Sequence, residues 1–233
     1  MIYITGDTHG PIDFDKLLRL KNLKVTRRDI LFILGDAGIC WDPIELKMMD
    51  IIYSYIGCTI YFIDGNHENF DMLEQFPIIE KYGAKMHKIS KYIYHVMRGE
   101  ILKIKNMKIL CIGGAYSIDR WHRREGISWW PQEEITKSNI DNALTNLEKV
   151  NNKVDYIFTH CVNTGIVRTV FHFKRDDSTD WLNVINRVAN YKYWLFGHYH
   201  FDRDVARNKK CIYKKIYFIN TNKELEELKD GNE

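Results

Sequence analysis

Cysteine is scarce in this sequence, and its spacing shows no disulfide or metal-binding pattern. The five cysteines are dispersed, odd in number and without a CxxC pair: Cys40, Cys58, Cys111, Cys161 and Cys211. A small secreted domain held together by disulfides would show an even, closely spaced set. We therefore expect reduced, buried thiols and a cytoplasmic protein.

Long apolar runs are also missing. No stretch approaches the roughly 18 consecutive apolar residues that a membrane-spanning helix needs, so we expect no membrane association. We expect no signal peptide either, because the first strand begins at once. The net charge is only +3. This value suits a phosphate-bearing small-molecule substrate and gives weak support to nucleic acid as a partner.

Apolar residues are sufficient for a sizeable core. The 233 residues are 45% hydrophobic and 28% charged, a composition that excludes a disordered protein. An α/β protein of this length commonly forms one domain. We predict a single domain over residues 1–233, with a charged, frayed tail at residues 223–233. The oligomeric state is left open.

Periodicity gives a coarse order of elements. It predicts helices within residues 13–24, 43–55, 69–76, 131–150 and 180–190. Three close-spaced strands, at residues 92–96, 100–104 and 108–112, are typical of a meander, which we expect in a second, more antiparallel sheet. Strands at residues 211–213 and 215–219 are expected to return to that second sheet.

Five apolar strands end on residue types that bind metals. Residues 30–34 form an unbroken apolar run, typical of a strand buried on both faces, and Gly35 and Asp36 follow it. The other four strands run into Asp7 and His9, into Asn66 and His67, into His160, and into His198 and His200. Open α/β sheets bind ligands at the carboxyl ends of their strands. A buried Asp36 there needs a cation to neutralise it, and Gly35 allows a close approach of the backbone.

The five blocks resemble the calcineurin-like metallophosphoesterase family. They are Gly6-Asp7-Thr8-His9-Gly10, Gly35-Asp36, Gly65-Asn66-His67-Glu68, His160, and Gly197-His198-Tyr199-His200, in that order. The resemblance implies an α/β fold, a four-layer αββα sandwich of two mixed β-sheets flanked by helices. It also implies two metal sites that share Asp36, the first with Asp7, His9 and His200, the second with Asn66, His160 and His198.

The implied chemistry is hydrolysis of a phosphate ester at two divalent cations. A hydroxide between the cations would attack phosphorus in line, and His67 would assist the leaving group rather than bind metal. An alternative for His67 is a plain hydrogen bond to a core carbonyl. Mixed imidazole and carboxylate ligands suit Mn²⁺ first, with Fe, Zn or Ni as alternatives.

One part of the resemblance is incomplete. Phosphoprotein phosphatases follow the central Gly-Asp with Val-Asp-Arg-Gly, whereas residues 37–41 here read Ala-Gly-Ile-Cys-Trp. This difference puts protein phosphatase activity in doubt. We expect Arg120, Arg123 and Arg124 to supply the phosphate grip instead. Trp129 and Trp130 either stack a base or belong to the core.

Three functions remain open from the sequence. The first is a phosphatase acting on a phosphomonoester or a nucleotide-type substrate. The second is a phosphodiesterase or nuclease, which would need a long basic groove. The third is a non-catalytic scaffold with the same fold, against which the complete ligand set and His67 argue.

Overall fold

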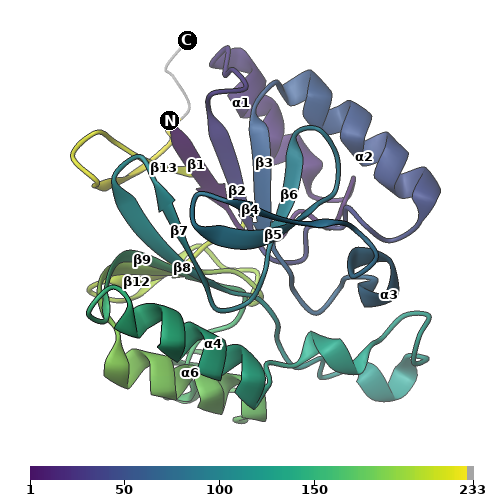
Figure 1. Cartoon of the computed structure of the whole chain (residues 1–233). Coiled ribbons are helices and arrows are strands. Elements are labelled where there is room, and N and C mark those ends of the chain that lie inside the picture. Colours follow the sequence, from purple (N-terminus) through teal and green to yellow (C-terminus); the bar gives the residue numbers. More distant parts are fainter. Residues whose placement is uncertain (230–233) are drawn as a thin grey trace.

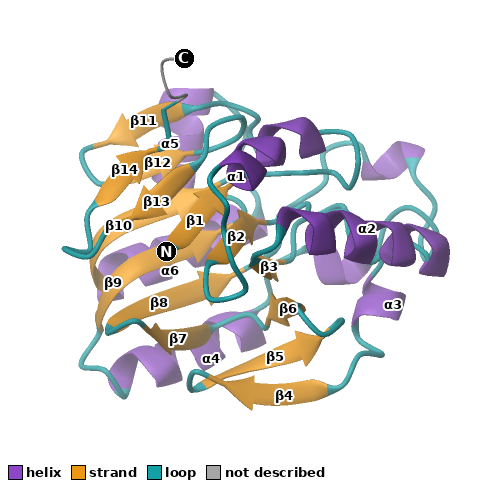
Figure 2. Ribbon diagram, turned by 90° about the horizontal axis from the view of Figure 1, so that it is seen from above, coloured by secondary structure: helices purple, strands orange, loops and turns teal. Residues whose placement is uncertain are grey.

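Two mixed β-sheets form the centre of the molecule. The computed structural model describes residues 1–229, and in these residues the first sheet has the order β14-β13-β1-β2-β3-β6-β5-β4 and the second β11-β12-β10-β9-β8-β7. Helices α1 and α2 cover one outer face, and α4 and α6 cover the other (Figure 1). The sheets lie between them, as the view from above also shows (Figure 2). This arrangement confirms the expected αββα fold class.

The strands of each sheet are short. Those of the first sheet are β1 (Ile2–Thr5), β2 (Ile30–Leu34), β3 (Thr59–Ile63), β4 (Ile78–Lys81), β5 (Ala84–Lys88), β6 (Ile93–Val96), β13 (Tyr217–Ile219) and β14 (Leu225–Glu227). Those of the second are β7 (Glu100–Ile104), β8 (Met107–Ile112), β9 (Lys153–Thr159), β10 (Asn190–Phe196), β11 (Arg203–Ala206) and β12 (Lys209–Cys211).

The helices lie mainly in the connections between strands. They are α1 (Leu18–Asn22), α2 (Pro43–Ile56), α3 (Phe70–Leu73), α4 (Lys137–Glu148), α5 (Thr164–Ile166) and α6 (Asp177–Val188). Helix α2 begins where the sequence predicts, because the Asp42 carboxylate accepts hydrogen bonds from the N–H groups of Ile44 and Glu45. It ends at Gly57, which adopts the left-handed conformation with φ 95°.

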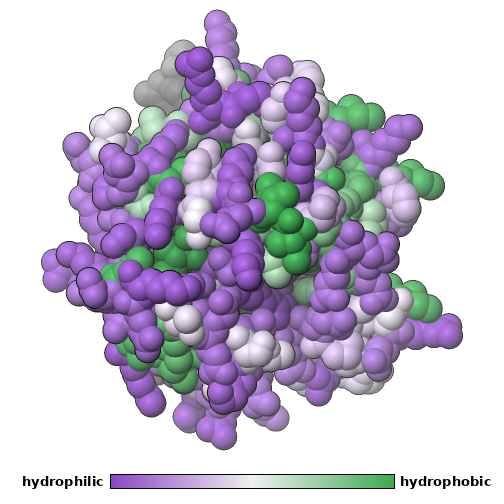
Figure 3. All heavy atoms as spheres, viewed as in Figure 1, coloured by the Kyte–Doolittle hydropathy of each residue, from purple (hydrophilic) through white to green (hydrophobic). Residues whose placement is uncertain are grey.

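Alternation along the strands divides the apolar residues into layers. Phe32 points between the sheets and packs edge-on against Phe158, with ring centroids 4.8 Å apart. Its neighbour Leu31 points the other way, into the cluster that contains Tyr53 of α2. Both faces of β2 are therefore buried, which explains its unbroken apolar run. The surface seen in Figure 3 is mostly hydrophilic, and its hydrophobic residues form small, separate patches.

The predicted meander is wrong, because its strands belong to different sheets. Strand β6 pairs in parallel with β3 in the first sheet. Of the three strands expected in the meander, only β7 and β8 form a hairpin with each other, and this hairpin lies in the second sheet. The chain crosses between the sheets at Gly99, whose φ is 82°. The hairpin of β4 and β5, for which the sequence analysis gave no strands, pairs with β6 from the other side.

Three further predictions need correction. The helix expected at residues 131–150 is a 3-10 turn followed by α4, because Thr136 caps a new helix through the N–H of Asn139. Strand β13 joins the first sheet, antiparallel to β1, instead of the second. The tail expected to be frayed contains β14, which pairs with β13. The rest of that tail, residues 230–233, lies outside the described residues.

The two sheets bring their parallel strands to a common edge. Strands β1, β2 and β3 are parallel neighbours in the first sheet, and β9 and β10 are parallel neighbours in the second.

Within residues 1–229, no helix has the length and apolar character needed to cross a bilayer.

Candidate metal centre

All seven predicted metal ligands meet at this common edge. Asp7 and His9 follow β1, Asp36 follows β2, Asn66 follows β3, His160 follows β9, and His198 and His200 follow β10. Residues from the two sheets are in direct contact there. The Nε2 atom of His160 lies 3.3 Å from Oδ2 of Asp36 and 3.1 Å from Oδ1 of Asn66. Nε2 of His200 lies 3.1 Å from Oδ2 of Asp7.

Asp36 occupies the middle of the group. Its Oδ2 is 3.5 Å from Nε2 of His9 on one side and 3.3 Å from Nε2 of His160 on the other. The other oxygen, Oδ1, accepts a hydrogen bond of 2.8 Å from the N–H of His67. The residue is 2% exposed. This position between the two histidines is the one that a shared ligand requires.

Glycines let the strand ends approach each other. A Cβ atom on Gly35 would lie 2.1 Å from Nδ1 of His160, so the close approach predicted at Gly35 is to the ring of a ligand. Equivalent Cβ atoms on Gly65 and Gly197 would lie 2.0 Å and 2.2 Å from the carboxylate oxygens of Asp36 and Asp7. Any side chain at these three positions would displace a ligand.

The backbone of the site is strained. Four of the seven ligands have positive φ without being glycine: His9 (44°), Asp36 (47°), His198 (68°) and His200 (54°). Such conformations cost of order 1–3 kcal/mol each and cluster at functional sites. Eight other non-glycine residues within residues 1–229 also have positive φ, so the strain agrees with a functional site but does not identify one by itself.

Further residues orient the ligands. His9 Nδ1 lies 2.9 Å from Oδ2 of Asp13, and His160 Nδ1 lies 2.8 Å from the carbonyl of Leu34. In each ring the Nε2 atom is left to face the centre. The amide of Asn66 donates to Ser117 Oγ at 3.0 Å, and Ser117 in turn donates to the Glu133 carboxylate. The sequence did not predict these roles for Asp13, Ser117 and Glu133.

A buried ionic network supports the loop behind Asn66. The Asp64 carboxylate contacts Arg98 and, at 3.0 Å, Nε2 of His95. Arg98 also donates to the carbonyls of Gln132 and Glu134, on either side of Glu133. The same network ends at His87, whose Nδ1 lies 3.0 Å from Nδ1 of His95.

The electrostatics of the site fit a cation. Burial alone would raise the pKa of Asp36, but His160 and His9 outweigh it and hold the pKa well below its ordinary value. Burial would lower the pKa of both histidines, yet the neighbouring carboxylates raise each to about 9. Protons on these rings thus balance buried carboxylates, a role that a divalent cation takes over on binding.

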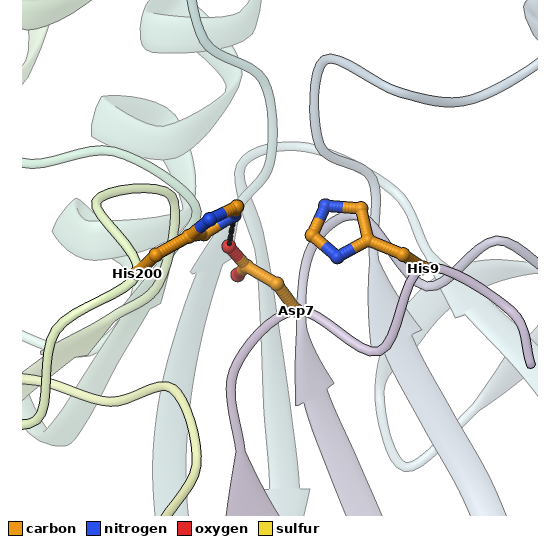
Figure 4. A group of neighbouring side chains, drawn as sticks. All are labelled: Asp7, His9 and His200. Atoms are coloured by element: carbon orange, nitrogen blue, oxygen red, sulfur yellow. Dashed lines mark ion pairs between the residues drawn. The ribbon is translucent and has the colours of Figure 1, made fainter. Parts of the chain in front are cut away.

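Ligand atoms of one group converge. Single ligand atoms of Asp7, His9 and His200 all lie within 4.8 Å of one another. The two rings flank the carboxylate (Figure 4). Burial and the proximity of His160 lower the pKa of His198 to about 3, so this ring is the free base that metals bind. The residues present therefore fit divalent metal ions.

A cavity of about 800 Å³ opens beside the ligands. Asp36, Asn66, His198 and His200 line it together with His67, Arg120 and Arg123. Arg123 donates from Nη2 to Nε2 of His67 at 3.0 Å, and Asp119 holds the same guanidinium through Nε and Nη2. His67 is thus not bonded to a core carbonyl through this atom. Burial is the largest effect that lowers its pKa, and Arg123 adds to it.

The remaining residues expected at the substrate are less central. Arg120 pairs with Glu134 at 2.6 Å. Arg124 is exposed and does not line the cavity, so its expected substrate contact is not supported. A 3-10 turn at Arg120–His122 precedes the two arginines, and Arg123 is the one that lines the cavity. Trp130 is a core residue, 3% exposed, and Trp129 is half-buried beneath Arg120.

Comparisons with known proteins agree with this geometry. The family model described as calcineurin-like phosphoesterase matches residues 1–202. No curated protein matches the sequence. One solved structure aligns with a TM-score of 0.58 at 10% identity, covering 97% of both chains. The TT1561 protein of Thermus thermophilus aligns with a TM-score of 0.50 at 10% identity, covering 97% of this chain and 96% of its own. At such identities the two structures show similarity of fold alone.

Proposed function

This chain belongs to the calcineurin-like phosphoesterase family, and on that premise we propose that it hydrolyses a small phosphomonoester or nucleotide-type substrate with the help of two divalent cations. The observation that carries the proposal is the position of Asp36. Its buried carboxylate lies between His9 and His160, at the base of a cavity that also contains His67 and Arg123.

The ligands divide into two groups around Asp36. We assign one cation to Asp7, His9, Asp36 and His200, and the other to Asp36, Asn66, His160 and His198. Bound there, divalent cations would neutralise phosphoryl charge and acidify a water molecule. Mn²⁺ is the first choice for this mixed donor set, with Fe, Zn or Ni as alternatives.

Arg123 and His67 act on the substrate in this proposal. The Arg123 guanidinium only donates hydrogen bonds, so Nε2 of His67 accepts its bond as a neutral ring. Asp119 fixes the direction of the guanidinium from behind, at 2.8 Å and 3.0 Å. The pair takes the place of the missing Val-Asp-Arg-Gly residues. Arg123 is set to grip phosphate oxygens, and the neutral His67 to stabilise the leaving oxygen. To protonate that oxygen, the ring would first have to release Arg123 and take up a proton.

The test compares p-nitrophenyl phosphate with bis-p-nitrophenyl phosphate before and after metal removal. We expect Mn²⁺-loaded protein to prefer the monoester, EDTA to abolish the activity, and added Mn²⁺ to restore it. Full activity in metal-stripped protein would contradict the metal dependence. A preference for the diester would replace the phosphatase by the phosphodiesterase, and steep salt dependence of oligonucleotide binding would indicate a nuclease.

A further inference from the structure

The cavity continues well beyond the metal ligands, and one of its walls is aromatic. Tyr199 lies between the ligands His198 and His200 in the chain, and its ring is 4.8 Å from that of His198. Tyr199 and Phe173 both line the cavity, together with Val167. The apolar wall therefore begins directly at the metal centre.

The rings of this wall are stacked in layers. Tyr199 stacks on Phe171 with centroids 4.1 Å apart and an interplanar angle of 10°. Phe173 stacks with Tyr199 at 6.1 Å and 23°. Tyr199 is only 9% exposed, whereas Phe173 is 53% exposed. Tyr199 is thus the buried member of the stack, and Phe173 is its exposed ring in the cavity lining.

The local backbone is shaped to present Phe173. Residues Val167–Phe171 form a short π-helix, a rare conformation that is frequent at functional sites. His172 then adopts φ 58°, and the N–H of Phe173 returns to the carbonyl of Val167 at 3.2 Å. This reversal brings the side chain of Phe173 back to the ring of Tyr199.

A second exposed apolar group lines the cavity. Ile118, on the loop that holds Asp119 and Arg123, lines the same cavity and is 80% exposed. The lining also includes charged residues, among them Lys174, Arg175, Asp176 and Asp177. A small, fully polar ester would leave the apolar residues of the cavity unused.

We propose that the leaving group of the substrate carries a flat aromatic ring, which stacks on the exposed ring of Phe173 beside Tyr199. The inference rests on the proposed function, because the phosphate is taken to lie at the metal ligands. Parallel layers select a planar ring over an aliphatic chain. An aryl group and a nucleobase share this chemistry.

Benzyl phosphate and ethyl phosphate form a suitable pair, because both leave as alcohols of similar basicity and only one carries a ring. We expect kcat/KM for benzyl phosphate to exceed that for ethyl phosphate by about tenfold, the usual scale of one stacking contact. Phe173→Ala should reduce that ratio to near one. Phe201→Ala is the matched control, since Phe201 is 55% exposed and near Phe171 but does not line the cavity. It should retain the ratio.

Binding provides a readout that does not depend on turnover. Calorimetry with Mn²⁺-loaded protein should show benzylphosphonate binding about tenfold tighter than ethylphosphonate, and Phe173→Ala should remove the difference. Equal affinities, or equal kcat/KM values for the two esters, would overturn the aromatic leaving group while leaving the phosphatase proposal intact. If neither ester is hydrolysed, the phosphatase proposal fails, and the phosphonate affinities alone decide this inference. Comparing adenosine 5′-monophosphate with ribose 5-phosphate then distinguishes a nucleobase from an aryl group.

Discussion

Replacing Gly35 by alanine tests how the two sheets close around the metal centre. The added methyl group would lie 2.1 Å from Nδ1, 2.5 Å from Cγ and 2.9 Å from Cβ of His160. These atoms belong to the rigid base of a buried side chain, so the neighbour cannot swing away. Gly35 also has φ +90°, a conformation that alanine adopts only with strain.

The two costs can be estimated separately. Overpacking a core position costs about 1–3 kcal/mol, and a left-handed alanine costs about 1–2 kcal/mol. The reduced entropy of the unfolded chain returns about 0.4–1 kcal/mol. The net loss is about 1–5 kcal/mol, or roughly 2–20 °C in Tm for a chain of this size. Displacing His160 should also weaken metal binding about 10- to 100-fold.

Gly126→Ala is the control for this prediction. Gly126 has φ +71°, but its added methyl would meet no atom within 4 Å. It therefore carries the backbone cost without the steric one. Thermal unfolding with and without Mn²⁺ should show a larger fall in Tm for Gly35→Ala, and a smaller stabilisation by the metal. If Gly35→Ala loses no more than Gly126→Ala in both conditions, the close packing of β2 against His160 is wrong.

Four other predictions concern separate groups. Asp36→Asn should lower the metal content at both sites, measured by mass spectrometry. His67→Ala should keep its metal and lose turnover about 100-fold or more. An emptied metal site in His67→Ala would refute this division of roles. Arg123→Lys should lower kcat/KM about 10- to 100-fold at unchanged metal content, because lysine cannot contact Asp119 and His67 together. A wild-type rate would show that the arginine does not grip the substrate. Burial, followed by the proximity of His95, lowers the pKa of His87 to about 4, below its ordinary value of 6.5. The unfolded chain therefore takes up a proton first, so stability falls as the pH drops from 6.5 towards 4, by up to about 1.4 kcal/mol per pH unit. His87→Asn should reduce that slope in urea unfolding, and an unchanged slope would assign it to other groups.

The residues predicted as ligands could be located from the sequence because the signal is local. Each follows an apolar strand directly, and the carboxyl ends of parallel strands share an edge whatever the rest of the fold does. Asp36 and His160 follow strands of different sheets, so this rule alone does not bring them together, and it was the resemblance to the calcineurin-like family that implied a common site. The steric role of Gly35 follows from the same logic, although its partner could not be named.

Non-local choices could not be made in the same way. Residues 215–219 alternate as a strand would in either sheet, and only the pairing of β13 with β1 decides between them. Arg123 and Arg124 are adjacent residues of the same type, so the sequence cannot tell which of them faces His67. The turn before them decides this. Asp13 lies four residues after His9, and this spacing is a signal from which its contact with the His9 ring could have been predicted. Ser117 and Glu133 reach Asn66 through the fold alone.

The metal centre joins distant parts of the chain, since Asp7 and the N–H group of His198 that contacts it are separated by 191 residues. During synthesis the site cannot assemble until β10 has left the ribosome, however early β1, β2 and β3 pair. A cation with affinity for the finished site alone favours the complete molecule over every shorter intermediate. The availability of that ion would then govern how much of the newly made protein completes folding, as well as how fast the finished protein works.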